Sequence, residues 1–142
     1  MNDPTQTPLP SGQAIPIVSI VGHSGAGKTT LIEKLIRELR QRGYRVATIK
    51  HHAHAQAGSE QVILSASDRV AAIRYVDHPL TLDEIAAQLI RDVDIVLTDG
   101  FSGEDKPKIE VLRADLNPDL MCRPEALIAV ATDVGLALDL PQ

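Results

Sequence analysis

The chain has 142 residues, of which 44% are hydrophobic and 23% are charged, with nine Gly, nine Pro, one Cys and no Trp. This length suits a single domain, and the composition is that of an ordinary globular protein. A single cysteine excludes an internal disulfide framework and a four-cysteine zinc site, and it fits a reducing compartment. The formal net charge of −5, with one Phe and two Tyr, argues against a nucleic-acid-binding surface.

The beginning of the chain predicts a lead-in, a strand and a helix. Residues 1–14 contain three prolines and predict a flexible segment before one domain over residues 15–142. Residues 15–21 form a short apolar run, typical of a strand buried on both faces. From residue 29 to residue 42, apolar side chains recur at helical spacing, and Gly43 suits the left-handed position after a helix. No membrane helix or secretory signal is expected.

The rest of the chain alternates between strand and helix patterns. Thr81 and Glu84 have the spacing of a capping box, which opens a helix through about Ile90. Further strands are expected at residues 44–50, 61–65, 70–76, 92–97, 108–113 and 127–132. This alternation predicts an α/β fold with a mainly parallel sheet and flanking helices.

Residues 22–29 fit in full the pattern G-x-x-x-x-G-K-[ST] of a phosphate-binding loop. Its glycines let the chain turn tightly, so that successive backbone N–H groups point at phosphate oxygens. Lys28 supplies a cation, and the Thr29 hydroxyl is suited to Mg²⁺. The motif joins an apolar strand to an amphipathic helix, which favours phosphate binding over a glycine-rich turn without a ligand. The candidate phosphate-binding residues are Gly22, His23, Ser24, Gly25, Ala26, Gly27, Lys28, Thr29 and Thr30.

A phosphate-binding loop requires an acidic partner at the end of another core strand, to reach Mg²⁺ directly or through water. Asp99 follows an apolar run and precedes Gly100, and it is the candidate. A turn Asp before Gly is the alternative interpretation. The phosphate loop favours the metal role, so Thr29 and Asp99 are the predicted metal ligands. Asp94, at the other end of the same run, is interpreted as structural.

Histidines cluster after the second predicted strand, in the stretch Lys50-His51-His52-Ala53-His54. This is the strand end at which α/β sheets bind ligands. Contact with an anion and a solvated loop are both compatible with the pattern, and structural zinc is the less favoured interpretation.

Three later features have weaker signals. Lys106 and Lys108 either meet a phosphate or an anionic partner, or belong to a solvated loop. Asp133 ends an apolar strand and is a candidate acceptor for the N–H groups of guanine, although the usual Asn-Lys-x-Asp motif is absent and a turn Asp is the alternative. Cys122 is interpreted as a thiol without a catalytic role.

Taken together, these motifs resemble the MobB family, the GTP-binding adapters of molybdopterin guanine dinucleotide biosynthesis. The resemblance covers about residues 15–140. The stretches that carry it, in family order, are residues 18–31, 50–54, 99–101, 107–111 and 128–133. The K-H-x-x-H and G-F…P-K-I-E-V stretches are more specific than the phosphate loop, which many families share.

The resemblance implies a P-loop NTPase-type fold, GTP and Mg²⁺ as ligands, and at most weak GTPase activity. It also implies a cytoplasmic homodimer that assists MobA, the guanylyltransferase that joins GMP to molybdopterin, with molybdopterin as a further candidate ligand. Gly22 to Thr30 would hold the phosphates and Asp133 would contact guanine. Asp99 would stand where the family often has Glu, which keeps the carboxylate and shortens its reach.

The chain departs from the family after its histidines. Only about ten residues join Lys50 to Gln61, whereas a parallel crossover normally needs a dozen or more. Either the chain is a shortened member with an antiparallel or edge arrangement there, or a segment is missing. Two helices would not cover a sheet of about six strands, which predicts a homodimer. A small-molecule phosphotransferase and a structural dimer with a vestigial loop remain alternative functions.

Overall fold

The structure is a computed structural model that describes residues 14–51, 61–74, 76–116 and 119–133. Its main sheet has five strands in the order β2-β5-β1-β6-β7. The elements of this unit are β1 (Ile17–Val21), α1 (Lys28–Gln41), β2 (Val46–Lys50), α2 (Leu82–Leu89), β5 (Ile95–Asp99), β6 (Lys108–Leu112), a short 3-10 turn (Pro124–Ala126) and β7 (Leu127–Thr132). The predicted lead-in lies outside the described residues, except for Ala14.

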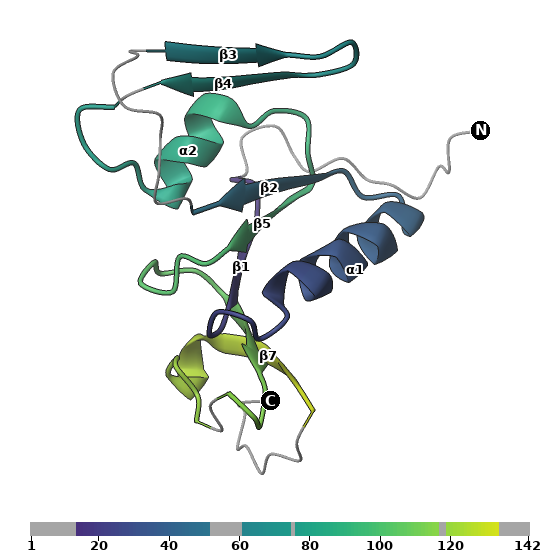
Figure 1. Cartoon of the computed structure of the whole chain (residues 1–142), viewed down its shortest axis with the longest axis vertical. Coiled ribbons are helices and arrows are strands. Elements are labelled where there is room, and N and C mark those ends of the chain that lie inside the picture. Colours follow the sequence, from purple (N-terminus) through teal and green to yellow (C-terminus); the bar gives the residue numbers. More distant parts are fainter. Residues whose placement is uncertain (1–13, 52–60, 75, 117–118, 134–142) are drawn as a thin grey trace.

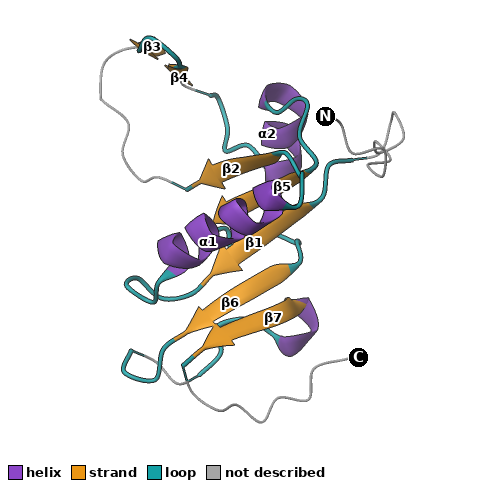
Figure 2. Cartoon of the chain, turned by 90° about the vertical axis from the view of Figure 1, so that its right-hand side faces the viewer, coloured by secondary structure: helices purple, strands orange, loops and turns teal. Residues whose placement is uncertain are grey.

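All neighbouring strands of the main sheet pair in parallel, so the five arrows in Figure 2 point the same way. Their carboxyl ends therefore meet at one edge of the sheet, where α/β proteins bind ligands. Ile20 of β1 pairs in register with Asp99 of β5, and Asp99 pairs with Lys50 of β2 on its other side. The mainly parallel α/β fold predicted from the sequence is confirmed.

The two helices cover opposite faces of this sheet (Figure 2). Successive side chains of a strand point to opposite faces. On β1, Ile20 therefore packs in one cluster with Ile32 of α1, and Ile17 packs in the other with Leu82 of α2. Ile20 and Leu82 are fully buried, which places the core between the sheet and each helix.

Local signals fix where the helices begin and end. The capping box of α2 forms as predicted, because the Thr81 hydroxyl accepts a hydrogen bond from the Glu84 backbone and the Glu84 carboxylate accepts one from the Thr81 backbone. After α1, Gly43 has a φ of 87° and donates to the carbonyl of Arg40, as expected for a left-handed helix end. None of the described helices is long and apolar enough to cross a membrane.

The strands β3 (Gln61–Ser65) and β4 (Val70–Arg74) form a separate antiparallel hairpin. The structure thus shows the antiparallel arrangement that was one alternative for the chain after Lys50. Because β3 and β4 pair with each other, the main sheet has five strands and not about six. Figure 1 shows the hairpin beyond β2 and α2. The suggested missing segment, between His52 and Ala57, lies outside the described residues.

The strand β5 begins at Ile95, three residues later than the sequence predicts. Asp92 has a left-handed backbone with φ of 57°, which no strand residue adopts. Asp94 then pairs with Arg45, accepting from its backbone N–H at 2.7 Å and from its guanidinium at 3.0 Å. Asp94 is therefore a structural residue, as interpreted, that ties the start of β5 to the segment before β2.

Candidate functional site

The phosphate-binding sequence forms a tight loop between β1 and α1. Three of its glycines have positive φ: 148° at Gly22, 80° at Gly25 and 101° at Gly27. A Cβ at Gly22 would lie 2.5 Å from the carbonyl oxygen of Val111 on β6, so only glycine fits against this strand. The backbone N–H of Ala26 donates to the carbonyl of His23 at 3.0 Å and closes the turn.

Lys28, the first residue of α1, folds back over this loop. Its ammonium donates to the carbonyl oxygens of Gly22 at 2.9 Å and His23 at 3.1 Å. Gly27 is the N-cap and offers no side chain to the first turn of the helix. The backbone N–H groups of that turn have no intrahelical acceptor, and they lie at the positive end of the helix dipole. The loop therefore combines a cation, backbone donors and a dipole suited to a phosphate.

Asp99 lies on the strand next to this loop. It is the last residue of β5, and its side chain is 18% exposed. Its Oδ2 is 3.9 Å from the Lys50 ammonium. The adjacent Thr98 is buried, and its hydroxyl donates to the Ser19 hydroxyl of β1 at 3.0 Å. This side-chain hydrogen bond joins β5 to β1. The sequence-predicted Thr29 is the second residue of α1, which follows the loop after β1, and Asp99 ends β5, the parallel neighbour of β1.

Asp133 follows β7 and is separated from β1 by β6. Its Oδ1 accepts a hydrogen bond from the Ala114 backbone at 3.1 Å, and its Oδ2 lies 3.2 Å from the Arg113 guanidinium. Both oxygens thus have partners within the chain, and Asp133, which follows β7, is bonded to the two residues that follow β6. Its contact with guanine stays a prediction.

The two lysines of the stretch 106–108 do not lie in a solvated loop, as one interpretation had it. Lys108 is 5% exposed, and its ammonium donates to the carbonyls of Glu104 and Lys106. The Lys106 ammonium lies 2.7 Å from the Asp83 carboxylate of α2. Lys108 is buried because β6 is an inner strand of the sheet, and its ammonium binds backbone carbonyls of the preceding loop. Both cations fix the β5–β6 loop, residues 100–107.

Glu110 of β6, for which no role was predicted from the sequence, is fully buried. Its carboxylate accepts hydrogen bonds from the backbone N–H groups of Met121 at 2.6 Å and Cys122 at 3.1 Å. The signal that could have found it is a charged residue inside the apolar run Ile109–Leu112. Burial and the Glu110 carboxylate raise the pKa of the Cys122 thiol, which fits the interpretation that this cysteine has no catalytic role.

Phe101 has an unusual backbone. Its φ is 65°, a conformation that costs a bulky residue about 1–3 kcal/mol. It follows Gly100, whose φ is 95° and whose carbonyl lies 3.1 Å from the Thr98 hydroxyl. The Phe101 ring meets the His51 ring edge to face, with centroids 5.2 Å apart and planes at 80°. His52 and His54 lie outside the described residues, and among those described no cluster of three His, Cys, Asp or Glu could hold a metal.

A pocket of about 670 Å³ opens beside Asp99, between the end of β2 and the β5–β6 loop. We call it the β2–β5 pocket. Its lining comes from residues 49–51 of β2 and its end, from Pro79, Leu80 and Ile85 around the start of α2, and from residues 101–104 of the loop. It is distinct from the phosphate loop, because none of its lining residues belongs to residues 22–30.

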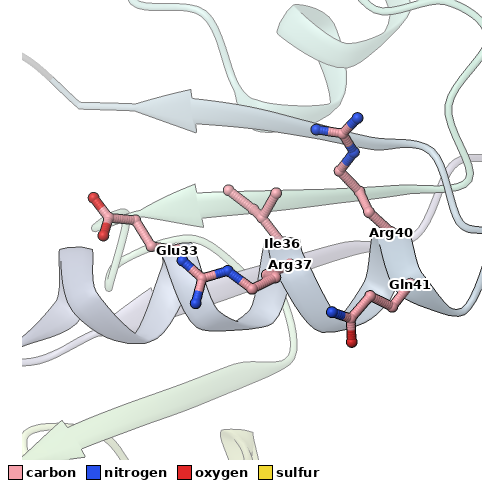
Figure 3. A pocket seen from close by; sticks show the side chains of 5 residues that line it. All are labelled: Glu33, Ile36, Arg37, Arg40 and Gln41. Carbon is pink, nitrogen blue, oxygen red and sulfur yellow. The ribbon is translucent and has the colours of Figure 1, made fainter.

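Another depression, of about 560 Å³, lies on α1 (Figure 3). Its five lining residues all come from this one helix: Glu33, Ile36, Arg37, Arg40 and Gln41. A single helix supplies no opposing wall. It also shares no residue with the phosphate loop, so we do not include it in the site.

A glycine loop between β1 and α1, a lysine that begins the helix, and an acidic residue on the next parallel strand define the P-loop NTPase class of α/β proteins. Within that class, residues 17–133 match the family model of MobB, described as molybdopterin guanine dinucleotide synthesis protein B. The chain belongs to the MobB family, as the sequence motifs predicted.

Curated relatives and a solved structure agree with this assignment. A molybdopterin-guanine dinucleotide biosynthesis adapter protein of Haemophilus influenzae is 41% identical over 140 residues, covering 88% of this chain and 79% of the relative. The protein of the same name from Escherichia coli is 33% identical over 144 residues, covering 88% and 82%. A crystal structure of molybdopterin-guanine biosynthesis protein B is 33% identical with a TM-score of 0.65, covering 85% of each chain.

Proposed function

We propose that this chain is a GTP-binding adapter of molybdopterin guanine dinucleotide biosynthesis. The observation that carries the proposal is the glycine loop, with the Lys28 ammonium held across it by the Gly22 and His23 carbonyls. Family membership adds the pathway, because the curated relatives are named as adapter proteins of that biosynthesis.

The residues of the loop suit a nucleoside triphosphate bound with Mg²⁺. The backbone N–H groups of residues 22–30 and the Lys28 ammonium would hold the phosphates. The Thr29 hydroxyl and the Asp99 carboxylate are hard oxygen ligands of the kind Mg²⁺ prefers. Thr29 is in the first turn of α1, after β1, and Asp99 ends the neighbouring strand β5. When bound, Mg²⁺ would neutralise phosphate charge. Asp133 is the proposed contact to guanine.

Weak or no hydrolysis is part of the proposal. Rapid hydrolysis requires a side chain that positions water and a cation that neutralises the transition state. The residues that follow Asp99 are Gly100, Phe101, Ser102, Gly103 and Glu104, and all of them are described. This stretch contains neither Gln nor Arg, which supports a protein that holds GTP rather than one that consumes it.

We also propose that the chain acts as a homodimer in the cytoplasm and that its partner is the guanylyltransferase MobA, as the family resemblance implies. The hairpin supports the dimer. Val70 and Ile73 of β4 are 68% and 46% exposed, and a two-stranded sheet is marginally stable alone. Val70 and Ile73 are three residues apart and face opposite sides of the hairpin, and a second copy that covers the Ile73 side would bury that side chain.

The test is calorimetric titration of GTP with Mg²⁺ into the wild type and a Lys28→Ala variant. We expect the variant to lose detectable GTP binding while its far-UV circular dichroism is unchanged. Lys34→Ala is the matched control, because Lys34 is an exposed lysine of the same helix. A Lys28→Ala variant that binds GTP like the wild type would contradict the proposal. Phosphate transfer to an added small acceptor, well above hydrolysis, would favour a phosphotransferase instead.

A further inference from the structure

We propose that the β2–β5 pocket is a second ligand site, built for a planar nitrogen heterocycle that carries an anionic group. Its volume of about 670 Å³ lies within the range of small-molecule sites, roughly 300–1,000 Å³. Sites of this kind combine an apolar wall with a few polar groups that fix the orientation of the ligand. The choice of a pterin as the test ligand rests on the proposed function, whereas the site itself rests on the pocket.

The wall of the pocket is apolar and comes from three parts of the fold. Ile49 belongs to β2, Leu80 and Ile85 come from the start of α2, and Phe101 comes from the β5–β6 loop. All four are partly buried, so they are ordered by packing and still face the pocket. The Phe101 ring supplies an aromatic surface on which a flat heterocycle can stack.

The walls are held in place before any ligand binds. The Lys106 ammonium, 2.7 and 2.8 Å from the two oxygens of Asp83, ties the β5–β6 loop to the first turn of α2. Beneath the loop, the buried Lys108 ammonium donates to the carbonyls of Glu104 and Lys106. Within the same loop, the Glu104 backbone N–H donates to the Phe101 carbonyl at 3.2 Å. A preformed pocket loses little entropy on binding.

The polar groups of the pocket carry opposite charges. Lys50 is the last residue of β2 and precedes His51, and Glu104 belongs to the β5–β6 loop; all three line the pocket. An ammonium group suits a phosphate or carboxylate of the ligand, and a carboxylate suits adjacent N–H donors of a heterocycle. Pterin and guanine rings both present such a pair of donors. The shared chemistry is therefore a ring with an amino group and a neighbouring ring N–H, joined to an anion.

The pocket adjoins the proposed nucleotide site through Asp99. The Lys50 ammonium lies 3.9 Å from the Asp99 carboxylate, and the His51 backbone donates to the Asp99 carbonyl at 3.3 Å. The phosphate loop lies on the other side of Asp99, after β1. The anionic end of a ligand held by Lys50 would thus lie beside the carboxylate that we assign to Mg²⁺.

The experiment titrates the full chain, loaded with one equivalent of GTP in Mg²⁺ so that no free GTP competes, with the fluorescent probe pterin-6-carboxylate. Two further arms use 6-hydroxymethylpterin, the same ring without the anion, and GMP. We expect the carboxylate probe to bind about tenfold more tightly than the neutral pterin, because it gains a charge-assisted contact. GMP that binds at this site in the protein loaded with one equivalent of GTP also supports the site, with a nucleotide as its source.

Two variants test whether the probe binds in the pocket. Ser102→Trp fills the mouth of the pocket from an exposed position, and Lys50→Ala removes the cation. We expect each to weaken pterin-6-carboxylate binding about tenfold or more, and Lys34→Ala on α1 to leave it unchanged. Probe binding that survives both variants overturns the proposal, as does binding of neither ligand by a chain that binds GTP. Failure of the wild-type chain to bind GTP would count against the proposed function instead, and it is measured in the GTP titration that compares the wild type with Lys28→Ala.

Discussion

Gly22 lies directly against the backbone of Val111, with 2.5 Å between the position of an added Cβ and the Val111 carbonyl oxygen. The first glycine of the phosphate loop is thus fixed by the neighbouring strand β6, as well as by the turn it begins. This contact with β6 positions the start of the loop at the sheet edge, in addition to the Lys28 ammonium that donates to the Gly22 carbonyl.

We predict that Gly22→Ala destabilises the protein by about 1–3 kcal/mol, because the new methyl group overlaps a backbone oxygen that cannot move freely. Urea denaturation measures the free energy of unfolding. Gly103→Ala is the matched control, because no heavy atom lies within 4 Å of its added Cβ, and we expect it to change stability by less than about 0.5 kcal/mol. Equal stabilities of the two variants would contradict the argument.

Asp99 should make GTP binding depend on Mg²⁺. We predict that Asp99→Asn lowers GTP affinity about tenfold in Mg²⁺ and changes it little in EDTA, because an amide is a weaker ligand for a hard cation. Asp99→Glu, which restores a carboxylate, should recover the Mg²⁺ dependence. Asp105→Asn, at an exposed position on the β5–β6 loop that follows Asp99, is the control. A Mg²⁺ dependence that survives in Asp99→Asn would remove the metal role.

The sequence predicted the parts of this fold that depend on local chemistry. Gly43 and the pair Thr81 and Glu84 are signals contained within a few residues, and the structure confirms both helix ends. The phosphate loop has the same character, because its glycines define its own turn. Parallel pairing then follows from the alternation of strands and helices.

What the sequence did not reveal depends on contacts between distant segments. Lys108 looked like a loop cation, but it begins β6, an inner strand of the sheet, and is buried there. Its partners are backbone carbonyls that no motif indicates. Glu110 is similar, since the backbone N–H groups that donate to its carboxylate lie more than ten residues away, at Met121 and Cys122. The β2–β5 pocket needs Ile49, Ile85 and Phe101 from three separate elements, so only the folded chain brings it together.

Glu110 should be a stability residue rather than a ligand. Glu110→Ala removes the acceptor of the Met121 and Cys122 backbone N–H groups at a fully buried position, and we expect a loss of about 2–4 kcal/mol in the free energy of unfolding. Glu125→Ala, at an exposed position, should be close to neutral. Chemical denaturation of both variants decides the point. A Glu110→Ala variant as stable as the wild type would show that these two bonds contribute nothing.

The pair of Arg45 and Asp94 predicts a stability that falls in acid. Hydrogen bonds from the Arg45 side chain and backbone lower the pKa of Asp94 below its usual range. The Asp94 carboxyl thus binds a proton less readily in the folded state than in the unfolded state. The stability that Asp94 contributes is therefore fully present above its unfolded pKa, and it is lost as the pH falls through the lower folded pKa. Asp94→Asn should therefore lose less stability than the wild type below about pH 4. Parallel acid-denaturation curves for the two proteins would contradict this.

The exposed hairpin predicts a dimer that depends on concentration. We expect sedimentation equilibrium to show a dimer at micromolar concentration, and Ile73→Lys to weaken it about tenfold or more, because a charge would enter the covered surface. Leu89→Lys is the matched control, since Leu89 is 64% exposed on α2, outside the hairpin. A compact monomer at micromolar concentration, or equal loss of the dimer in both variants, would exclude the hairpin as the interface. Retention of GTP binding in Ile73→Lys would then separate assembly from nucleotide binding, because β4 shares no residue with the phosphate loop.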